Sequence, residues 1–353
     1  MKIHGKMQGL RRRLYAGLFD ALGERGLSRF YAPKFAGIGV VVSAHRIIEA
    51  GDATLEPGYA LTTTALETYL ESVRRIGWDI VTPDQVHDAL VGDRGSRRFV
   101  CFTFDDGYAD NYRYALPIFR RYGAPMAVYV ATGLLERSIF YWWAAVERLI
   151  LHHEEIDVDL PDDAAGARRL QARTLAEKRS LNQSLNEWCH ANLPRHESAL
   201  RALLARYGID PGALLDADAL SVQQLAELSR DPLVTIGSHC MSHRRLSTLP
   251  EAEVAEELGG SRRILEATTG REVRHVAYPF GSRDACGPRE FAAAAACGYR
   301  TGVTTRRGNI FSQHRGQLLS LPRREADERA TAARENLYGV SAILRGEPAI
   351  VTD

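Results

Sequence analysis

The sequence predicts an α/β fold: a distorted barrel of seven or eight parallel strands with a helical insertion. Short apolar, β-branched runs alternate with amphipathic helical patterns along most of the chain. Such alternation implies a parallel sheet, and about eight repeats favour a closed barrel over an open sheet. Between about 141 and 230 the pattern changes to Ala, Leu, Glu, Gln and Arg without a strand signal, which predicts the insertion.

Strands and helices are expected in turn along the barrel part of the chain. The expected strands are 37–45, 78–81, 98–104, 125–132, 233–237, 273–277, 300–305 and 318–322. The expected helices are 62–76, 83–89, 114–122, 250–269 and 288–297. Glycine follows four of these helices (Gly77, Gly123, Gly270 and Gly298), as is typical of a left-handed cap.

The chain divides into three predicted regions: a helical leader at 1–36, the barrel at 37–325, and a tail at 326–353. Leucines 10, 14, 18 and 22 share one face of the leader beside three arginines. This helix is expected to pack on the barrel, although a basic helix is also compatible with contact at a membrane surface. No signal-peptide pattern is present, so we expect a cytoplasmic location, with peripheral contact at the inner membrane face as the alternative.

Charge and cysteine usage exclude several classes of protein. The formal net charge is +1, so no overall field favours nucleic acid. The five cysteines are odd in number and form no CxxC pair, which disfavours a disulfide framework or a thiolate zinc site. Nothing in the sequence indicates an oligomeric state.

Two adjacent carboxylates, Asp105 and Asp106, follow the strand at 98–104. Two ionised carboxylates repel each other and are costly to bury, unless a bound cation or a shared proton compensates their charge. One carboxylate can bind a metal while the other handles a proton, and Gly107 permits the tight turn. The alternative is an Asx turn in which one aspartate caps the next helix.

His239 and His243 follow the strand at 233–237 and are four residues apart. Such a pair can hold one ion, although surface helices often carry it by chance. With one carboxylate it forms a three-ligand site that favours Zn²⁺ and leaves room for water and substrate.

Aromatic residues supply the remaining candidates. Tyr278-Pro279-Phe280-Gly281 follows another strand; its turn could aim an amide N–H at an oxyanion, but it is also simply a turn. Trp142 and Trp143 suit the face of a sugar ring, and packing in the core is the alternative.

In this chain order the motifs TFDDG (103–107), SHCMSH (238–243) and AYPFG (277–281) resemble the polysaccharide deacetylase family, carbohydrate esterase family four. The family includes the chitooligosaccharide deacetylases. SAHRI (43–47) and DDGYADN (105–111) resemble its exopolysaccharide-type branch. The resemblance spans roughly 38–325 and implies a distorted barrel. It also implies a hydrolase that removes N-acetyl groups from an amino sugar in a polysaccharide, oligosaccharide or glycolipid.

The resemblance also implies roles for particular residues. Asp105 is expected to be the general base, and Asp106, His239 and His243 to bind a divalent metal ion, with Zn²⁺ favoured. The backbone N–H of Phe280 is expected to stabilise the oxyanion. Tyr278, Trp142 and Trp143 are expected to contact the substrate, an N-acetylated glycan.

The sequence departs from the family pattern in three places, the smallest being Cys240, which stands where members usually carry Ser or Thr. Ala277 stands where members carry the arginine that orients the base, so Arg274 or Arg323 would have to replace it. Leu321-Pro322-Arg323 lacks the histidine of the Leu-x-His motif, which supplies the general acid. By residue type alone the acid candidates are His45, His275 and His314, and His314 is expected at the surface.

Two other functions therefore remain open from the sequence. The same site could hydrolyse a small amide, as in allantoinase-like relatives. The chain could also be an inactive, metal-containing glycan-binding protein.

Overall fold

The computed structural model describes residues 34–49, 51, 52, 54–56, 58–92, 97–329, 332–340, 342 and 348–352. The predicted leader lies almost wholly outside these residues, so its helix and its membrane contact stay predictions. Within the described ranges, no helix combines the length and apolar character that crossing a bilayer requires.

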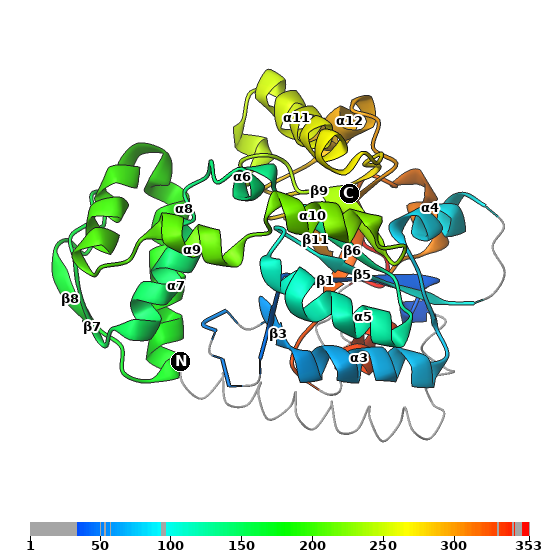
Figure 1. Cartoon of the computed structure of the whole chain (residues 1–353), viewed down its shortest axis with the longest axis horizontal. Coiled ribbons are helices and arrows are strands. Elements are labelled where there is room, and N and C mark those ends of the chain that lie inside the picture. The colour runs from blue at the N-terminus through cyan, green and yellow to red at the C-terminus, as the bar shows by residue number, and fades with distance from the viewer. Residues whose placement is uncertain are drawn as a thin grey trace.

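Seven parallel strands close into a barrel (Figure 1). In spatial order they are β1 (Gly39–Ala44), β12 (Leu321–Glu325), β11 (Thr301–Arg307), β10 (His275–Ala277), β9 (Val234–Ser238), β6 (Met126–Val130) and β5 (Phe99–Phe104). The barrel closes because β1 pairs with β5 as well as with β12. The short strand β4 (Asp79–Ile80) pairs with β5 outside this closure. The predicted parallel barrel is confirmed.

Helices cover the outside of the barrel, most of them packed through one large apolar core. They are α3 (Thr63–Ile76), α4 (Pro83–Val91), α5 (Leu116–Tyr122) after a π-helical turn (Asn111–Ala115), α10 (Val222–Arg230), α11 (Glu251–Thr269), α12 (Pro288–Ala296) and α13 (Ala332–Leu337). Val86 and Leu90 of α4 belong to a separate apolar cluster. Thr62 caps α3, and Gly77 ends it at φ 80°, as the sequence predicts. The short elements are β2 (Arg46–Ile48), β3 (Ala60–Thr62), α6 (Thr132–Leu135) and the 3₁₀ turns Leu246–Thr248 and Ser312–Gly316.

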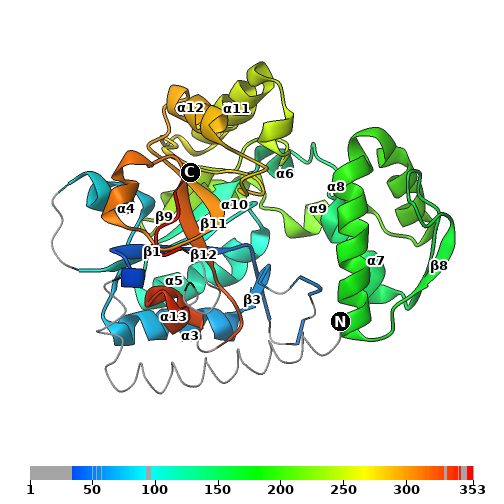
Figure 2. The same ribbon diagram turned by 180° about the vertical axis from the view of Figure 1, so that it is seen from behind.

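The insertion lies to one side of the barrel and has an apolar core of its own (Figures 1 and 2). It comprises α7 (Trp142–His152), β7 (Glu155–Val158), β8 (Arg168–Gln171), the kinked α8 (Leu175–Arg206) and α9 (Pro211–Asp218). Helix α10 falls within the predicted range of 141–230 but packs on the barrel strand β9.

The expectation of no strand between 141 and 230 is wrong. β7 and β8 pair in antiparallel fashion, with Asp157 opposite Arg169. The strands are short, and their outward positions are charged. Arg169 donates to both oxygens of Asp157, at 2.7 and 3.1 Å, so the acidic run forms cross-strand ion pairs.

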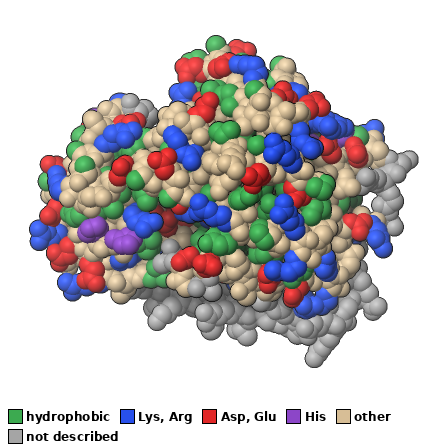
Figure 3. Space-filling view, viewed as in Figure 1, with side chains coloured by type: hydrophobic (Ala, Val, Ile, Leu, Met, Phe, Trp, Pro, Cys, Tyr) green, Lys and Arg blue, Asp and Glu red, His purple; other side chains and the backbone are tan. Residues whose placement is uncertain are grey.

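Charged side chains of both signs are mixed over the face of the molecule shown in Figure 3. All five cysteines are free thiols, as their spacing predicts. The described part of the tail covers the barrel, where α13 packs on α3 and Asn336 donates to the hydroxyl of Tyr69 at 3.2 Å.

Candidate active site

The three predicted motifs converge at the carboxyl ends of β5, β9 and β10. The barrel brings these strand ends to one face, where a cavity of about 240 Å³ opens between the barrel and the insertion. It is lined by His45, Glu56, Tyr59, Asp105, Asp106, Trp142, Trp143, Asn186, His190, His239, His243, Tyr278, Phe280 and Thr305. The residues expected to act as base, metal ligands, oxyanion donor or substrate contacts all line this cavity: Asp105, Asp106, His239, His243, Phe280, Tyr278, Trp142 and Trp143.

Asp106, His239 and His243 form a cluster suited to a metal ion. The Oδ1 atom of Asp106 lies 3.3 Å from the Nε2 atom of each imidazole. One ligand atom from each residue falls within 4.8 Å of the others. Oδ1 is buried and accepts no hydrogen bond from the described residues.

The tautomer of His239 explains why a cation fits this cluster. Its Nδ1–H donates to the carbonyl oxygen of Ala277 at 2.7 Å, since a carbonyl oxygen can only accept. In the neutral ring Nε2 then presents a lone pair to the unpaired oxygen of Asp106. Two lone pairs at this separation repel each other, and a divalent cation between them removes the conflict.

The two neighbouring carboxyl groups are both held in the ionised form. Burial opposes ionisation of Asp106, but His239 and His243 outweigh it and lower its pKa well below the ordinary value. Burial likewise opposes ionisation of Asp105, and Arg323 with His239 outweighs it, so that this pKa is also lowered. Burial lowers the pKa of His239, and the two aspartates raise it overall.

Arg323 holds Asp105 through a buried two-bond ion pair. Its Nη1 and Nη2 donate to Oδ1 and Oδ2 of Asp105 at 2.8 and 2.6 Å. The side chains are only 1% and 2% exposed. The guanidinium also donates to Thr103 and to the carbonyl of Thr304, so its position is fixed. Of the two arginines named as replacements for the missing one, Arg323 reaches Asp105.

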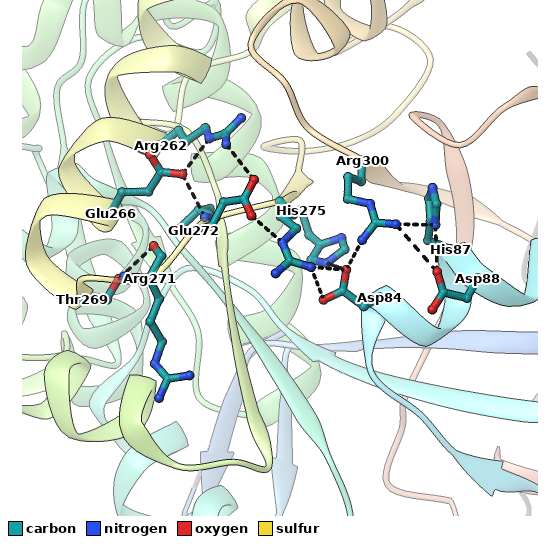
Figure 4. Close-up of polar contacts among 12 residues, drawn as sticks. Asp84, His87, Asp88, Arg262, Glu266, Thr269, Arg271, Glu272, His275 and Arg300 are labelled. Atoms are coloured by element: carbon teal, nitrogen blue, oxygen red, sulfur yellow. Dashed lines mark hydrogen bonds and ion pairs between the residues drawn. The ribbon is translucent and has the colours of Figure 1, made fainter. Parts of the chain in front are cut away.

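Arg274 and His275 lie in another polar cluster, where β10 begins (Figure 4). Arg274 and Arg300 donate to Asp84 on α4, at 3.1 and 2.8 Å, and His275 lies 3.4 Å from the same carboxylate. His275 is the first residue of β10, and the cavity lies beyond the last. It is therefore not placed to act on a substrate there.

The other two candidates for the general acid, His45 and His314, lie in different surroundings. Nε2 of His45 lies 4.0 Å from Oδ2 of Asp105, and the ring stacks on Tyr59 with a 4.6 Å centroid separation. The expectation that His314 is exposed is wrong. It is 0% exposed, and both of its ring nitrogens have partners: Nδ1 accepts from the backbone N–H of Phe311, and Nε2 contacts the carbonyl of Val351.

Strained backbone concentrates at this cavity. Of the six described non-glycine residues with positive φ, four lie here: Asp106, Cys240, His243 and Phe280. L-residues adopt this conformation only when the surroundings over-determine it, and such strain gathers at functional sites. No local sequence signal announces these angles.

Glu257 of α11 holds the turn that carries His243. Its Oε2 accepts from the backbone N–H groups of Met241 and Ser242, at 2.8 and 2.9 Å, and its Oε1 bonds the hydroxyl of Ser242. The carboxylate is 5% exposed. It therefore fixes the loop between the two imidazoles without touching the cavity.

The predicted aromatic residues line the cavity in different ways. Tyr278 is fully buried and donates its hydroxyl to the carbonyl of Leu319 at 3.0 Å, so that group is already engaged. The Phe280 ring lies 5.1 Å from that of His243, and its amide N–H has no partner among the described residues. Trp142 and Trp143 open α7, and Trp143 lies 5.1 Å from His243.

Five cavity residues were not anticipated from the sequence: Tyr59, Glu56, Asn186, His190 and Thr305. Tyr59 donates its hydroxyl to Oδ2 of Asp106 at 3.0 Å and also bonds Tyr108. Glu56 lies in the loop between β2 and β3, while Asn186 and His190 come from α8. None belongs to a motif, and Asn186 and His190 reach the cavity only because the insertion packs on the barrel.

A parallel barrel with a carboxylate and two histidines at its strand ends defines a class of metal-site α/β barrel proteins. The family model described as polysaccharide deacetylase matches residues 92–163 and 195–302, about half of the chain. The chain belongs to the polysaccharide deacetylase family. Members of this family are hydrolases of amide bonds.

Individual relatives agree with this assignment. YxkH of Bacillus subtilis (strain 168), whose name assigns it to the polysaccharide deacetylases, is 32% identical over 65 residues. That match covers 18% of this chain and 23% of YxkH, so it spans under a quarter of the relative's length.

Solved structures share the fold at low sequence identity. The deacetylase PplD of Streptococcus pyogenes is 19% identical with a TM-score of 0.54, over 84% of this chain and 95% of PplD. IcaB from Ammonifex degensii is 17% identical with a TM-score of 0.53, over 86% and 97% of the two chains. The BpsB deacetylase domain of Bordetella bronchiseptica is 18% identical with a TM-score of 0.52, over 82% and 96%.

Proposed function

We propose that this protein removes acetyl groups from N-acetylated amino sugars of a glycan, by metal-assisted hydrolysis of the amide. The observation that carries the proposal is the unpaired Asp106 oxygen, 3.3 Å from two imidazole nitrogens, beside a second ionised carboxylate. The likeness to IcaB and BpsB supports the fold. The exopolysaccharide type of substrate is part of this proposal.

Asp106, His239 and His243 would hold the divalent ion, and two nitrogen ligands with one oxygen favour Zn²⁺. When bound, this ion polarises the acetyl carbonyl and makes a water molecule more acidic. Tyr59 donates to the second oxygen of Asp106, which keeps the carboxylate turned so that Oδ1 faces the imidazoles.

Asp105 serves as the general base that accepts a proton from the attacking water. Arg323 keeps this carboxylate ionised and fixes the direction of both oxygens. An inactive glycan-binding protein needs no oriented carboxylate beside its metal ligands. The Asp105–Arg323 pair therefore supports catalysis over binding alone.

We assign the protonation of the leaving amine to His45. Burial lowers its pKa, but the charges of Asp106 and Asp105 favour the protonated ring that this role requires. His45 lines the same cavity as Asp105, with its Nε2 near that carboxylate. The competing donor is the Tyr59 hydroxyl, but burial and Asp106 raise its pKa well above the ordinary value, which makes it a poor acid. The free N–H of Phe280 supplies a donor for the oxyanion.

Two variants test the proposal. Asp106→Asn should abolish tight metal binding and acetate release together, whereas Asp105→Asn should keep the metal and lose most of the turnover. Metal content is measured by plasma mass spectrometry and acetate by a coupled enzymatic assay on N-acetylglucosamine oligomers. Near-normal acetate release by Asp105→Asn would show that the base is assigned wrongly.

A further inference from the structure

The insertion supplies one wall of the cavity. Trp142 and Trp143 come from α7, and Asn186 and His190 come from α8. The rings of Trp142 and Phe280 each lie edge-on to His190, with centroid separations of 5.1 and 5.2 Å. This wall is therefore aromatic near the predicted metal ligands.

A carboxylate lies in the same cavity, held by α8. Asn186 and Asn182 both donate their amide Nδ2 to Oε1 of Glu56, at 2.6 and 3.3 Å. Helix α7 fixes the loop as well, because Glu147 accepts from the backbone N–H of Leu55 and from the hydroxyl of Thr54. Both helices of the insertion thus set the position of Glu56.

These contacts leave acceptor atoms without donors. Oε2 of Glu56 takes no hydrogen bond from the described residues. Because Nδ2 of Asn186 faces a carboxylate, the orientation of its amide is fixed, and its Oδ1 is buried and unpaired. Buried acceptors almost always have a donor, so the buried and unpaired Oδ1 of Asn186 beside a cavity indicates a group supplied by a ligand. Glu56 is only partly buried, and its Oε2 is a second open acceptor in the same cavity.

We infer that Glu56 and Asn186 form a sugar subsite, in which they accept hydrogen bonds from ring hydroxyls of the glycan while the aromatic wall packs against the ring. Carboxylate and amide acceptors beside flat aromatic faces match the hydroxyls and the C–H face of a pyranose. The inference rests on the proposed function and gives the insertion a role in substrate recognition.

Kinetics on N-acetylglucosamine oligomers test the subsite. Glu56→Gln keeps the acceptor for both asparagines but replaces the free acceptor by a donor, and Asn186→Ala removes the second acceptor. Each should raise KM roughly tenfold or more, the effect of one hydrogen bond to a charged or buried group. Metal content should match the wild type in both variants, and the melting temperature should match it in Glu56→Gln, which keeps both asparagine contacts.

Gln183→Ala is the matched control, because Gln183 is exposed on the same helix and, among the described residues, pairs only with Glu187. Wild-type KM in both subsite variants would overturn the subsite and leave the proposed function intact. If activity falls only together with the melting temperature, the two residues have a structural role, and that result would also overturn the subsite. If the wild-type protein itself releases no acetate from any oligomer, the proposed function fails first.

Discussion

Replacing Arg323 by methionine should strongly destabilise the fold, because it leaves a buried carboxylate without its cation. The pair is 1% and 2% exposed and joined by two hydrogen bonds. Removing one partner of such a pair costs about 3–5 kcal/mol of unfolding free energy. The carbonyl of Thr304 also loses a donor. Urea denaturation followed by circular dichroism, in the presence of a chelator, measures the change without a metal contribution.

A double-mutant cycle separates this charge effect from lost packing. Asp105→Asn removes the charge that Arg323 compensates, so the double variant with Arg323→Met should be more stable than the sum of the single changes by about 1–3 kcal/mol. The reasoning is refuted if Arg323→Met costs under about 1 kcal/mol, or if the two changes are simply additive.

Three further predictions follow from contacts around the site. Glu257→Ala should weaken metal affinity by about 10–100-fold while leaving the barrel folded, since Glu257 fixes the turn before His243; isothermal titration with Zn²⁺ measures it, and unchanged affinity would contradict the role. Gly107→Ala should destabilise the protein by about 1–2 kcal/mol by thermal unfolding, because φ is 90° and the new Cβ would lie 3.0 Å from Val130; an unchanged melting temperature would show that the turn relaxes. His275, and after it Arg274 and Arg300, lower the pKa of Asp84 from 3.8 to about 2. This depressed pKa stabilises the fold above about pH 4, and the contribution is lost as the pH falls toward 2. Asp84→Asn should therefore cost about 1 kcal/mol or less at pH 7, since the carboxyl is partly exposed, and a difference that grows on acidification would contradict this sign.

The barrel could be predicted because several of its strands, above all β1, β5 and β6, are nearly continuous apolar runs, although β11 and β12 are more polar. Val40, Val41 and Val42 of β1, for example, are at most 2% exposed. Strands buried on both faces have this signature, and glycine caps mark the intervening helices. The strands of the insertion lack it. β7 and β8 are short and charged, and they are stabilised by cross-strand pairs that only the fold reveals.

The residues of the site were likewise predictable only in part. Asp105, Asp106, His239 and His243 were predictable because each follows a strand, and parallel strands end at one face. Arg323 was one of two open choices, because a sequence does not show which guanidinium reaches a carboxylate 218 positions away. Glu56 and Asn186 carried no signal at all, since their nearness is a product of how two separate cores pack.

Acetate release by metal-stripped protein tests the central claim most directly. The protein is dialysed against chelator, then titrated with Zn²⁺ while acetate from an N-acetylglucosamine oligomer is measured. We expect no release from the stripped protein and full recovery near one ion per chain, with no recovery in the His239→Ala variant. Release that persists without metal, or that returns equally in His239→Ala, would contradict hydrolysis at this cluster.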